Sequence, residues 1–328
     1  MDKTEGITVI DVVNNLGKYR MIPVSDFISE LEYIPLQTTR DCLVGESIRD
    51  IIVTSAHIFI TGPLGLGSFC YAFSRDGKFI GEIGSVGQGP GEYQFITRLS
   101  IDEKNQSLYL EASVRNLLEY SLDGVFRKSI DLPKNMGYLS TECVYPLSNN
   151  LFIGHIPNDR GSEEYNFILF NDSGQVIKSF VNHVKFERSG NWISGFDGAM
   201  KPFKVKQSLY LKEFTNDTLY CLNAQNELIP QYVFNLGKYA FPQHLKETYT
   251  PYASYEASYK DIITIPNRKY YSPMTGITNY FFFTFDVPVL GSIPVPKGRD
   301  RITTFSGQMI EFEERFPVGI YDIATQRL

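Results

Sequence analysis

The chain has 328 residues, with 31 Lys and Arg against 37 Asp and Glu, and a formal net charge of −6. Hydrophobic residues make up 43% and charged residues 21%, an ordinary globular composition that excludes a fibrous or largely disordered chain. The acidic balance excludes general nucleic-acid binding, which requires an excess of positive charge. The sequence contains no run of about 18 apolar residues, so it predicts no transmembrane segment.

Phe, Tyr and Trp amount to 14% of the residues, and this excess favours β-strands, whose pleated surfaces suit aromatic side chains. The first six residues, Met1 to Gly6, contain no apolar stretch of signal-peptide type. We therefore expect either a cytoplasmic protein or a mature form whose export signal has been removed. We predict that residues 1–30 are an N-terminal extension and that residues 31–328 form a single domain.

A ten-residue pattern occurs four times along the chain. The copies span residues 71–80, 118–127, 168–177 and 220–229. In each copy, apolar residues alternate on both sides of a short turn, which predicts a β-hairpin. The turn contains Gly77, Gly124 or Gly174 in the first three copies and Asn226 in the fourth. One turn position requires a positive φ, which Gly and then Asn tolerate best.

Two further strand patterns precede each hairpin. The nearer pattern spans residues 57–60, 107–110, 150–153 and 208–211. The farther pattern spans residues 48–54, 96–102 and 144–147 in the first three units. Each unit thus holds about four strands in about 50 residues, which is typical of the blades of a β-propeller. The sequence therefore predicts an all-β fold, a propeller of four-stranded antiparallel blades.

A glycine-rich segment, residues 83–93, follows the first hairpin. Pro90 occupies the position where a Walker loop needs lysine. A strand rather than a helix comes next, so the segment also fails the pattern of a dinucleotide-binding loop. We predict that it is the crossover from one blade to the next.

Three stretches resemble a known family. They are Glu32 to Thr39, Gly77 to Ile80 continuing to Gly87-Gln88-Gly89-Pro90-Gly91-Glu92-Tyr93, and Asn216 to Tyr220 with Pro230 to Tyr239. The family they resemble is a six-bladed β-propeller family, akin to NHL-repeat proteins, that is abundant in Bacteroides-type bacteria and has no assigned activity. The resemblance covers residues 8–240 well and the remainder poorly.

The resemblance also carries expectations about localisation. Members of the family generally have a lipoprotein export signal, which implies a periplasmic or outer-membrane-anchored protein with a lipid anchor in the full-length precursor. The segment Ile7 to Val12 is similar to the start of the mature protein just after such a signal.

The carboxyl-terminal third departs from the family pattern. We expect a fifth blade from residues 259–265 and 279–285, and a closing blade from residues 302–305, 309–313 and 319–323. A strand at Leu31 to Leu36 would complete the ring by pairing with the last blade, since ring closure removes exposed sheet edges. We predict six blades, with five as the alternative.

The sequence shows no catalytic constellation. The four histidines, His57, His155, His183 and His244, have no metal-ligand spacing. Glu311 and Glu313 share one strand face and are best interpreted as solvated. Ser194-Gly195 lacks the context of a nucleophile elbow, and Trp192 replaces its first glycine. We therefore predict no catalytic residue, no metal site and no cofactor.

Aligning the four repeats points instead to one mouth of the central channel. The residues just after the second strand occupy equivalent heights around a propeller axis, and here they differ from blade to blade. The predicted ligand-binding residues at this mouth are Glu111, Arg115, His155, Arg160, Lys212 and Glu213. Arg115, Arg160 and Lys212 add positive charge, which suits an anionic or carbohydrate-like ligand.

Three functional hypotheses remain open. The first is a non-catalytic propeller that binds a small molecule, a glycan or a protein. The alternative is a propeller enzyme (a lactonase, a lyase or a glycoside-processing enzyme) with calcium held in the axial channel by Glu111, His155 and Glu213. The third is a cell-surface docking module for other proteins. We favour the first, because the repeat pattern and the family resemblance support a propeller and the sequence shows no catalytic constellation.

The four cysteines are widely spaced. Cys42, Cys70, Cys143 and Cys221 form no CxxC motif. We interpret them as free, mostly buried thiols, while one or two disulfides remain open for an exported protein.

Overall fold

The computed structural model describes most of the first 237 residues and isolated strands beyond them. The described residues are 6–15, 25, 30–45, 48–63, 67–112, 115–134, 136, 144–147, 149–158, 161–187, 200–205, 208–213, 216–237, 240, 247, 262–264, 280–286, 300–303, 309–312 and 318–322. In this part of the chain, no helix is long and apolar enough to cross a membrane.

Four-stranded antiparallel sheets form the described body of the molecule. Blade 1 consists of β2 (Asp50–Val53), β3 (His57–Thr61), β4 (Cys70–Ser74) and β5 (Phe79–Glu82). Blade 2 consists of β8 (Arg98–Asp102), β9 (Ser107–Glu111), β10 (Asn116–Ser121) and β11 (Phe126–Asp131). In both blades the strands are hydrogen-bonded in sequence order, as the repeat pattern predicts.

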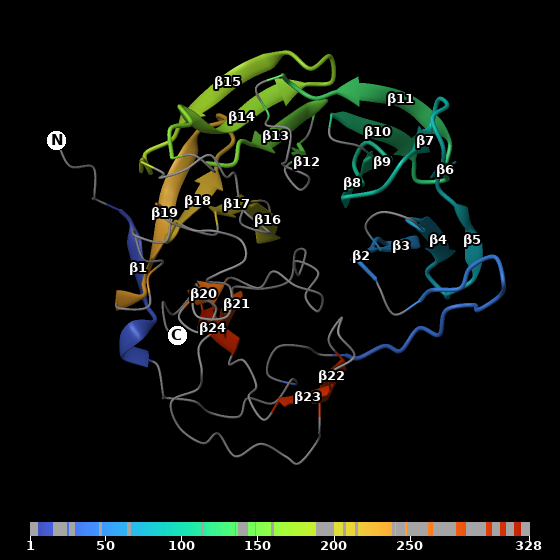
Figure 1. The fold of residues 1–328 in the computed structure, drawn as a ribbon, viewed down its shortest axis with the longest axis horizontal. Helices are drawn as coiled ribbons and strands as arrows, with labels where there is room; N and C mark the ends of the chain where they lie inside the picture. Colours follow the sequence, from blue (N-terminus) through green and yellow to red (C-terminus); the bar gives the residue numbers. More distant parts are fainter. Residues whose placement is uncertain are drawn as a thin grey trace.

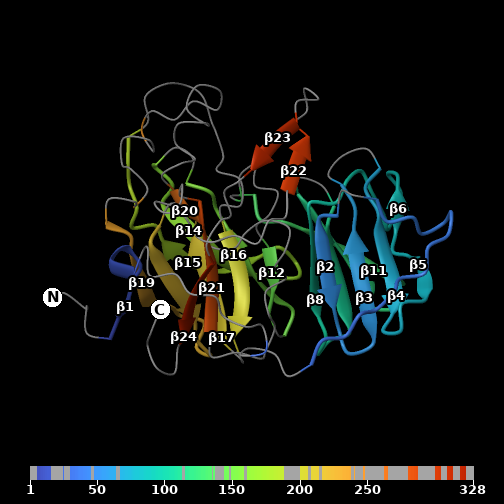
Figure 2. The ribbon, with the colours of Figure 1, turned by 90° about the horizontal axis from the view of Figure 1, so that it is seen from below.

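The next two blades repeat this order. Blade 3 consists of β12 (Val144–Pro146), β13 (Leu151–His155), β14 (Tyr165–Asn171) and β15 (Val176–Val181). Blade 4 consists of β16 (Met200–Val205), β17 (Ser208–Glu213), β18 (Thr218–Leu222) and β19 (Leu228–Asn235). The blades fan around a common centre, with β2, β8, β12 and β16 innermost (Figure 1). Viewed from the side, β2, β3, β4 and β5 of blade 1 stand next to one another (Figure 2).

The four hairpin turns share one local geometry. Their turn residues Gly77, Gly124, Gly174 and Asn226 have φ values of 85°, 86°, 75° and 57°. Three residues earlier stands Ser74, Ser121, Asn171 or Asn223, whose side-chain oxygen accepts a hydrogen bond from the backbone N–H four residues on. The positive φ expected from the sequence is thus confirmed in all four copies, and a local side-chain bond supports each turn.

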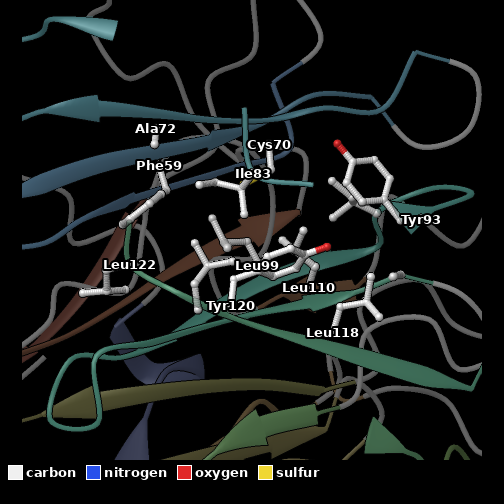
Figure 3. Close-up of a cluster of buried hydrophobic side chains, with 13 residues drawn as sticks. Phe59, Cys70, Ala72, Ile83, Tyr93, Leu99, Leu110, Leu118, Tyr120 and Leu122 are labelled. Atoms are coloured by element: carbon white, nitrogen blue, oxygen red, sulfur yellow. The ribbon is translucent and has the colours of Figure 1, made fainter. Parts of the chain in front are cut away.

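Neighbouring blades pack face to face through apolar side chains. Along a strand, successive side chains point to opposite faces, so each blade contributes to two interfaces. Leu110 of β9 packs toward blade 1, together with Phe59 of β3 (Figure 3). Leu108, two residues earlier on β9, belongs to the same cluster. Tyr109, between them in sequence, packs toward blade 3 against Phe152. A third cluster joins blade 3 to blade 4.

The glycine-rich segment is the crossover between blades 1 and 2, as predicted. It leaves β5, forms the short parallel pair β6 (Ser85–Val86) and β7 (Glu92–Tyr93), and enters β8. Tyr93 is buried in the cluster between the two blades (Figure 3). The Tyr120 hydroxyl donates to the Gly91 carbonyl at 2.8 Å. A Cβ at Gly91 would approach Phe126, so this glycine allows the crossover to pack closely against β11.

The amino-terminal part of the chain contacts both blade 4 and blade 1. The strand β1 (Thr8–Asp11) pairs in parallel with β19, the outermost strand of blade 4. A 3₁₀ turn, η1 (Val13–Asn15), follows. Farther along, the Gln37 N–H donates to the Gly77 carbonyl at 2.8 Å, and Ile34 and Leu36 pack against blade 1.

The structure corrects the prediction that Leu31 to Leu36 form a strand. This segment is extended but belongs to no sheet among the described residues. Its backbone passes the hairpin of blade 1, where a Cβ on Gly77 would lie 2.1 Å from the Pro35 carbonyl oxygen. The equivalent Gly174 of blade 3 faces the Asp131 carbonyl, at the end of blade 2. The N-terminal segment therefore occupies, against blade 1, the place that the end of a preceding blade occupies elsewhere.

The carboxyl-terminal strands lie where the sequence predicts strands but are paired differently. The described strands are β20 (Ile262–Thr264), β21 (Tyr280–Asp286), β22 (Asp300–Thr303), β23 (Met309–Phe312) and β24 (Val318–Asp322). The last strand, β24, joins β20 and β21 in one sheet instead of the predicted closing blade. The strands β22 and β23 pair with each other in a separate two-stranded sheet. The described residues thus form four complete blades, and the predicted six-bladed ring is not confirmed.

Candidate functional site

The second strands of all four blades end in a polar residue. These mouth positions are Thr61 in β3, Glu111 in β9, His155 in β13 and Glu213 in β17. The sequence alignment of the repeats predicts that they lie at equivalent heights. All four are buried, with exposed fractions of 0%, 3%, 1% and 8%. Because a buried polar group needs a partner, the contacts of each one define what this region does.

Glu111 joins blade 2 to blade 3. It has the same side-chain direction as Tyr109, because the two residues are two positions apart on one strand. Its Oε1 accepts a hydrogen bond from the Val144 N–H, the first residue of β12, at 2.9 Å. Thr97, just before β8, donates its hydroxyl to the Glu111 carbonyl at 3.2 Å. A carboxylate thus binds the innermost strand of the next blade.

Glu213 and His155 join blade 4 to blade 3. The His155 Nε2–H donates to Glu213 Oε1 at 3.2 Å. The other carboxylate oxygen, Oε2, accepts from Asn166 Nδ2 of β14 at 3.0 Å and from Asn216 Nδ2 at 3.3 Å. Burial opposes ionisation of Glu213, but the bond to His155 with its charge, and the two amides, outweigh burial and lower the pKa of this carboxyl.

Lys212 also points into the protein. Its ammonium donates to the Glu213 carbonyl at 2.7 Å and to the Asn216 carbonyl. The residue is buried, so backbone carbonyls provide the polar partners that a buried ammonium requires.

The two predicted arginines have different outcomes. Arg115 is half-buried, in the connection between β9 and β10, and its carbonyl accepts the Leu132 N–H at 2.8 Å. Arg160 lies outside the described residues. The structure therefore brings His155, Lys212 and Glu213 together at one interface and places Glu111 at another.

Sequence analysis missed three polar residues that form hydrogen bonds at the interfaces between blades. Asp50, at the start of β2, accepts the Leu99 N–H of blade 2 at 3.2 Å on its Oδ2. Asn166 and Asn216 hold Glu213. Asn166 had a usable signal, because it is a polar residue followed by the apolar run Phe167 to Phe170 in a strand. A buried amide in such a run requires a hydrogen-bond partner.

The described residues contain no group of three or more His, Cys, Asp and Glu side chains that could hold a metal ion. Both carboxylate oxygens of Glu213 already accept hydrogen bonds from N–H donors, so metal binding would require these bonds to break. Among the cysteines, Cys42 and Cys70 are buried free thiols, and Cys221 is a half-buried one. Burial strongly raises the pKa of the Cys70 thiol, and Glu82 adds to the effect, which makes this thiol unreactive. Cys143 lies outside the described residues.

The blades, their order and the polar mouth positions define a protein class, the β-propellers with four-stranded antiparallel blades. Comparison with known families then identifies the chain more closely. A family model described as a domain of unknown function (DUF4934) matches residues 7–327. The chain belongs to this family. A search of curated proteins returned no significant match.

One solved structure has a similar overall fold. A crystal structure from Bacteroides fragilis, described as a "Putative exported protein", is similar with a TM-score of 0.63 and 18% identity. The similarity covers 98% of this chain and 78% of that chain, and at this identity it shows the fold alone. A DUF4221 family member from Bacteroides vulgatus has a TM-score of 0.40 and 10% identity, covering 60% of this chain and 59% of its own.

Proposed function

We propose that this chain is a non-catalytic binding propeller that takes a small, anionic or carbohydrate-like ligand at the channel mouth. The observation that supports this is the difference between the mouth positions of the four blades, Thr61, Glu111, His155 and Glu213. The turns and the cores of the same blades repeat. A site that recognises an asymmetric ligand needs such variation at equivalent positions.

In this proposal the buried residues and the two arginines have different tasks. Glu111, His155, Lys212 and Glu213 hold neighbouring blades together and form the floor of the mouth. Arg115 and Arg160 supply the positive charge that a ligand would contact. The single propeller domain, residues 31–328, would carry the site, and residues 1–30 would be its extension.

Ligand screening by thermal shift tests the proposal. We expect anionic or polyhydroxylated compounds to raise the Tm, and Arg115→Gln to weaken the effect at least tenfold, with each shift measured from the ligand-free Tm of the same variant. Lys134→Gln, on a residue between blades 2 and 3, is the matched control for loss of one positive charge. Ligand stabilisation that is equal in both variants would argue against the mouth.

The same screen distinguishes the enzyme alternative. Calcium should not change the Tm if the carboxylates keep their present N–H donors. A rise in Tm with calcium, together with substrate turnover that is lost in Glu111→Gln, would contradict the binding proposal and support the enzyme alternative.

We further propose that the protein is exported and lipid-anchored, in the periplasm or at the outer membrane. The support is the family resemblance, together with the Bacteroides fragilis neighbour described as exported. Fractionation of the source cells, with lipid labelling of the full-length precursor, tests this. Recovery of the unlabelled protein in the cytoplasmic fraction would contradict it.

A further inference from the structure

The outermost strands of the blades differ in what lies along their outer edges. In blade 4, β19 is paired with β1, which adds a fifth, parallel strand to the sheet. In blades 1, 2 and 3, the strands β5, β11 and β15 are the last strands of their sheets. Each therefore has one edge without a strand partner among the described residues. Such an edge can accept a strand from another chain, and natural proteins usually protect it with charged side chains.

The edge of β15, on the rim of blade 3 (Figure 1), lacks this protection. Its Val176, Ile177 and Val181 side chains are 37%, 53% and 55% exposed. At the positions equivalent to Ile177 and Val181, β11 has Arg127 and Asp131. The strand β5 is shorter, with four residues, and exposes one large aliphatic side chain. Among these three edges, β15 is thus the one with the most exposed aliphatic side chains.

The single charged side chain of β15 is directed toward blade 4. Lys178 Nζ donates to the Asn226 carbonyl, in the hairpin turn of that blade, at 2.9 Å. It also lies 5.4 Å from the centroid of the Phe180 ring, which packs in the cluster between blades 3 and 4. Val181 follows Phe180 in the strand, so its side chain points to the opposite face of the blade. The lysine therefore places no charge beside Val181.

The backbone of β15 is also available at this position. The Asn182 N–H donates to the Glu164 carbonyl, on the side of β14, at 2.9 Å. Along an antiparallel strand, the hydrogen-bonding groups of successive residues point to alternate edges. The N–H and C=O groups of Val181 therefore point to the free edge, where no described strand pairs with them.

Blade 4 shows how such an edge is filled. Residues 232–235 of β19, which correspond to residues 180–183 of blade 3, pair with β1. The Val12 N–H continues this pairing with the Asn235 carbonyl, at 3.2 Å. Val9 lies opposite Val233, the equivalent of Val181. The molecule thus already holds an extended segment rich in β-branched residues at the position that has no described partner in blade 3.

The length of the edge indicates what kind of partner fits it. A stable dimer takes about 20 residues or more from each subunit, whereas β15 has six residues. Strand addition by a short extended peptide needs only such a length, because main-chain hydrogen bonds provide the affinity and alternate side chains provide the specificity. An extended segment of another protein therefore fits this edge better than a second copy of the chain does.

We propose that the free edge of β15 is a docking site for an extended segment of a partner protein, which adds to blade 3 as β1 adds to blade 4. The segment runs parallel to β15 and places a Val or Ile side chain opposite Val181. Its backbone pairs with the outward N–H and C=O groups of Val181. The inference goes beyond the proposed function and uses none of the mouth residues.

Fluorescence anisotropy of a labelled peptide, titrated with the whole chain, tests this. The probe is the peptide Ile-Thr-Val-Ile-Asp-Val-Val, which has the sequence of residues 7–13. We expect saturable binding, which Val181→Lys weakens at least tenfold because a charge on the edge opposes strand addition. A peptide with proline in place of its second isoleucine should not bind, since proline lacks the backbone N–H that pairs with a neighbouring strand.

The chain offers a matched control for the added charge. Val125 is 65% exposed, in the hairpin turn of blade 2, and belongs to no strand. Val125→Lys should leave peptide binding unchanged, and so should Arg115→Gln, the variant that tests the mouth. Circular dichroism and the Tm of each variant show whether the blades remain folded.

Several outcomes would overturn the inference. Peptide binding that is unchanged by Val181→Lys would place the peptide elsewhere, such as on β19 in exchange for β1. Equal losses in Val181→Lys and Val125→Lys would show an effect of net charge alone, and a loss in Arg115→Gln would place the peptide at the mouth. An absence of binding at millimolar concentration would also contradict the docking site. A dimer in sedimentation velocity that Val181→Lys dissociates would assign the edge to a second copy instead.

Discussion

His155 and Glu213 meet across the interface between blades 3 and 4, with Nε2 and Oε1 separated by 3.2 Å. At the other two interfaces between blades, a carboxylate accepts a hydrogen bond from a backbone N–H. Glu111 accepts from Val144, and Asp50 accepts from Leu99. At the interface between blades 3 and 4, the buried carboxylate of Glu213 is therefore held by another ionisable side chain. The strength of this contact depends on the protonation state of Glu213, whose pKa the contact lowers.

The first prediction concerns the pH dependence of Glu213. Its folded-state pKa is lowered from 4.5, because the His155 bond and the two amides outweigh burial. The stabilisation is fully present above pH 4.5 and is lost as the pH falls through the lowered folded value. At pH 7, Glu213→Gln should destabilise the protein by about 3 kcal/mol. Urea unfolding of both proteins across the acid range measures this.

The difference between the wild type and Glu213→Gln should shrink below pH 4.5. Glu227→Gln, on a residue at the hairpin turn of blade 4, is the control and should change little. A constant difference over the whole pH range would contradict the account of Glu213.

The second prediction concerns the hairpin turns. Gly174→Ala should cost roughly 1–2 kcal/mol for an L-residue at positive φ, and more because its Cβ would lie 2.6 Å from the Asp131 carbonyl oxygen. Asn226→Gly, at the equivalent position of blade 4, should be neutral within a few tenths of a kcal/mol. Chemical denaturation compares the two. A similar loss in both variants would show that the four turns are not equivalent.

A third prediction concerns the crossover. Tyr120→Phe removes the hydroxyl that donates to the buried Gly91 carbonyl. The unpaired carbonyl should destabilise the protein by about 1–2 kcal/mol. Tyr33→Phe is the matched control, because Tyr33 is 85% exposed and should show no change. Equal Tm values for the wild type and Tyr120→Phe would show that this hydrogen bond to the crossover does not stabilise the protein.

The fourth prediction concerns β1. Ile10 is fully buried, while its neighbour Val9 is 57% exposed. Ile10→Ala should therefore destabilise by about 3 kcal/mol, and Val9→Ala by less than about 0.5 kcal/mol. Denaturant midpoints measure both. If Ile10→Ala has no effect, β1 adds nothing to the stability of blade 4.

Local patterns made much of the fold predictable. The turn residues Gly77, Gly124, Gly174 and Asn226 could be identified because their φ requirement acts within four residues. The glycine-rich crossover was recognisable by the same kind of local constraint. These features need no knowledge of distant parts of the chain, and the structure confirms them.

Long-range pairing was not predictable in the same way. Nothing in the residues of β24 distinguishes pairing with β21 from pairing with β23, because both partners are short apolar strands. The parallel partner of β1 was likewise invisible in the sequence. At the mouth, His155 and Glu213 were both singled out, but not their contact, which joins residues 58 positions apart. Asn166 completes that contact from a third strand.

The parallel pairing of β1 with β19 has a consequence for biosynthesis. Asp11 and Asn235, which are hydrogen-bonded in this pairing, are 224 positions apart. The amino-terminal strand leaves the ribosome long before its partner has been synthesised. Its apolar side therefore stays exposed to solvent until blade 4 is complete. Contacts of such separation form late and slow the folding of a chain, which makes the nascent protein dependent on whatever shields that strand during translation.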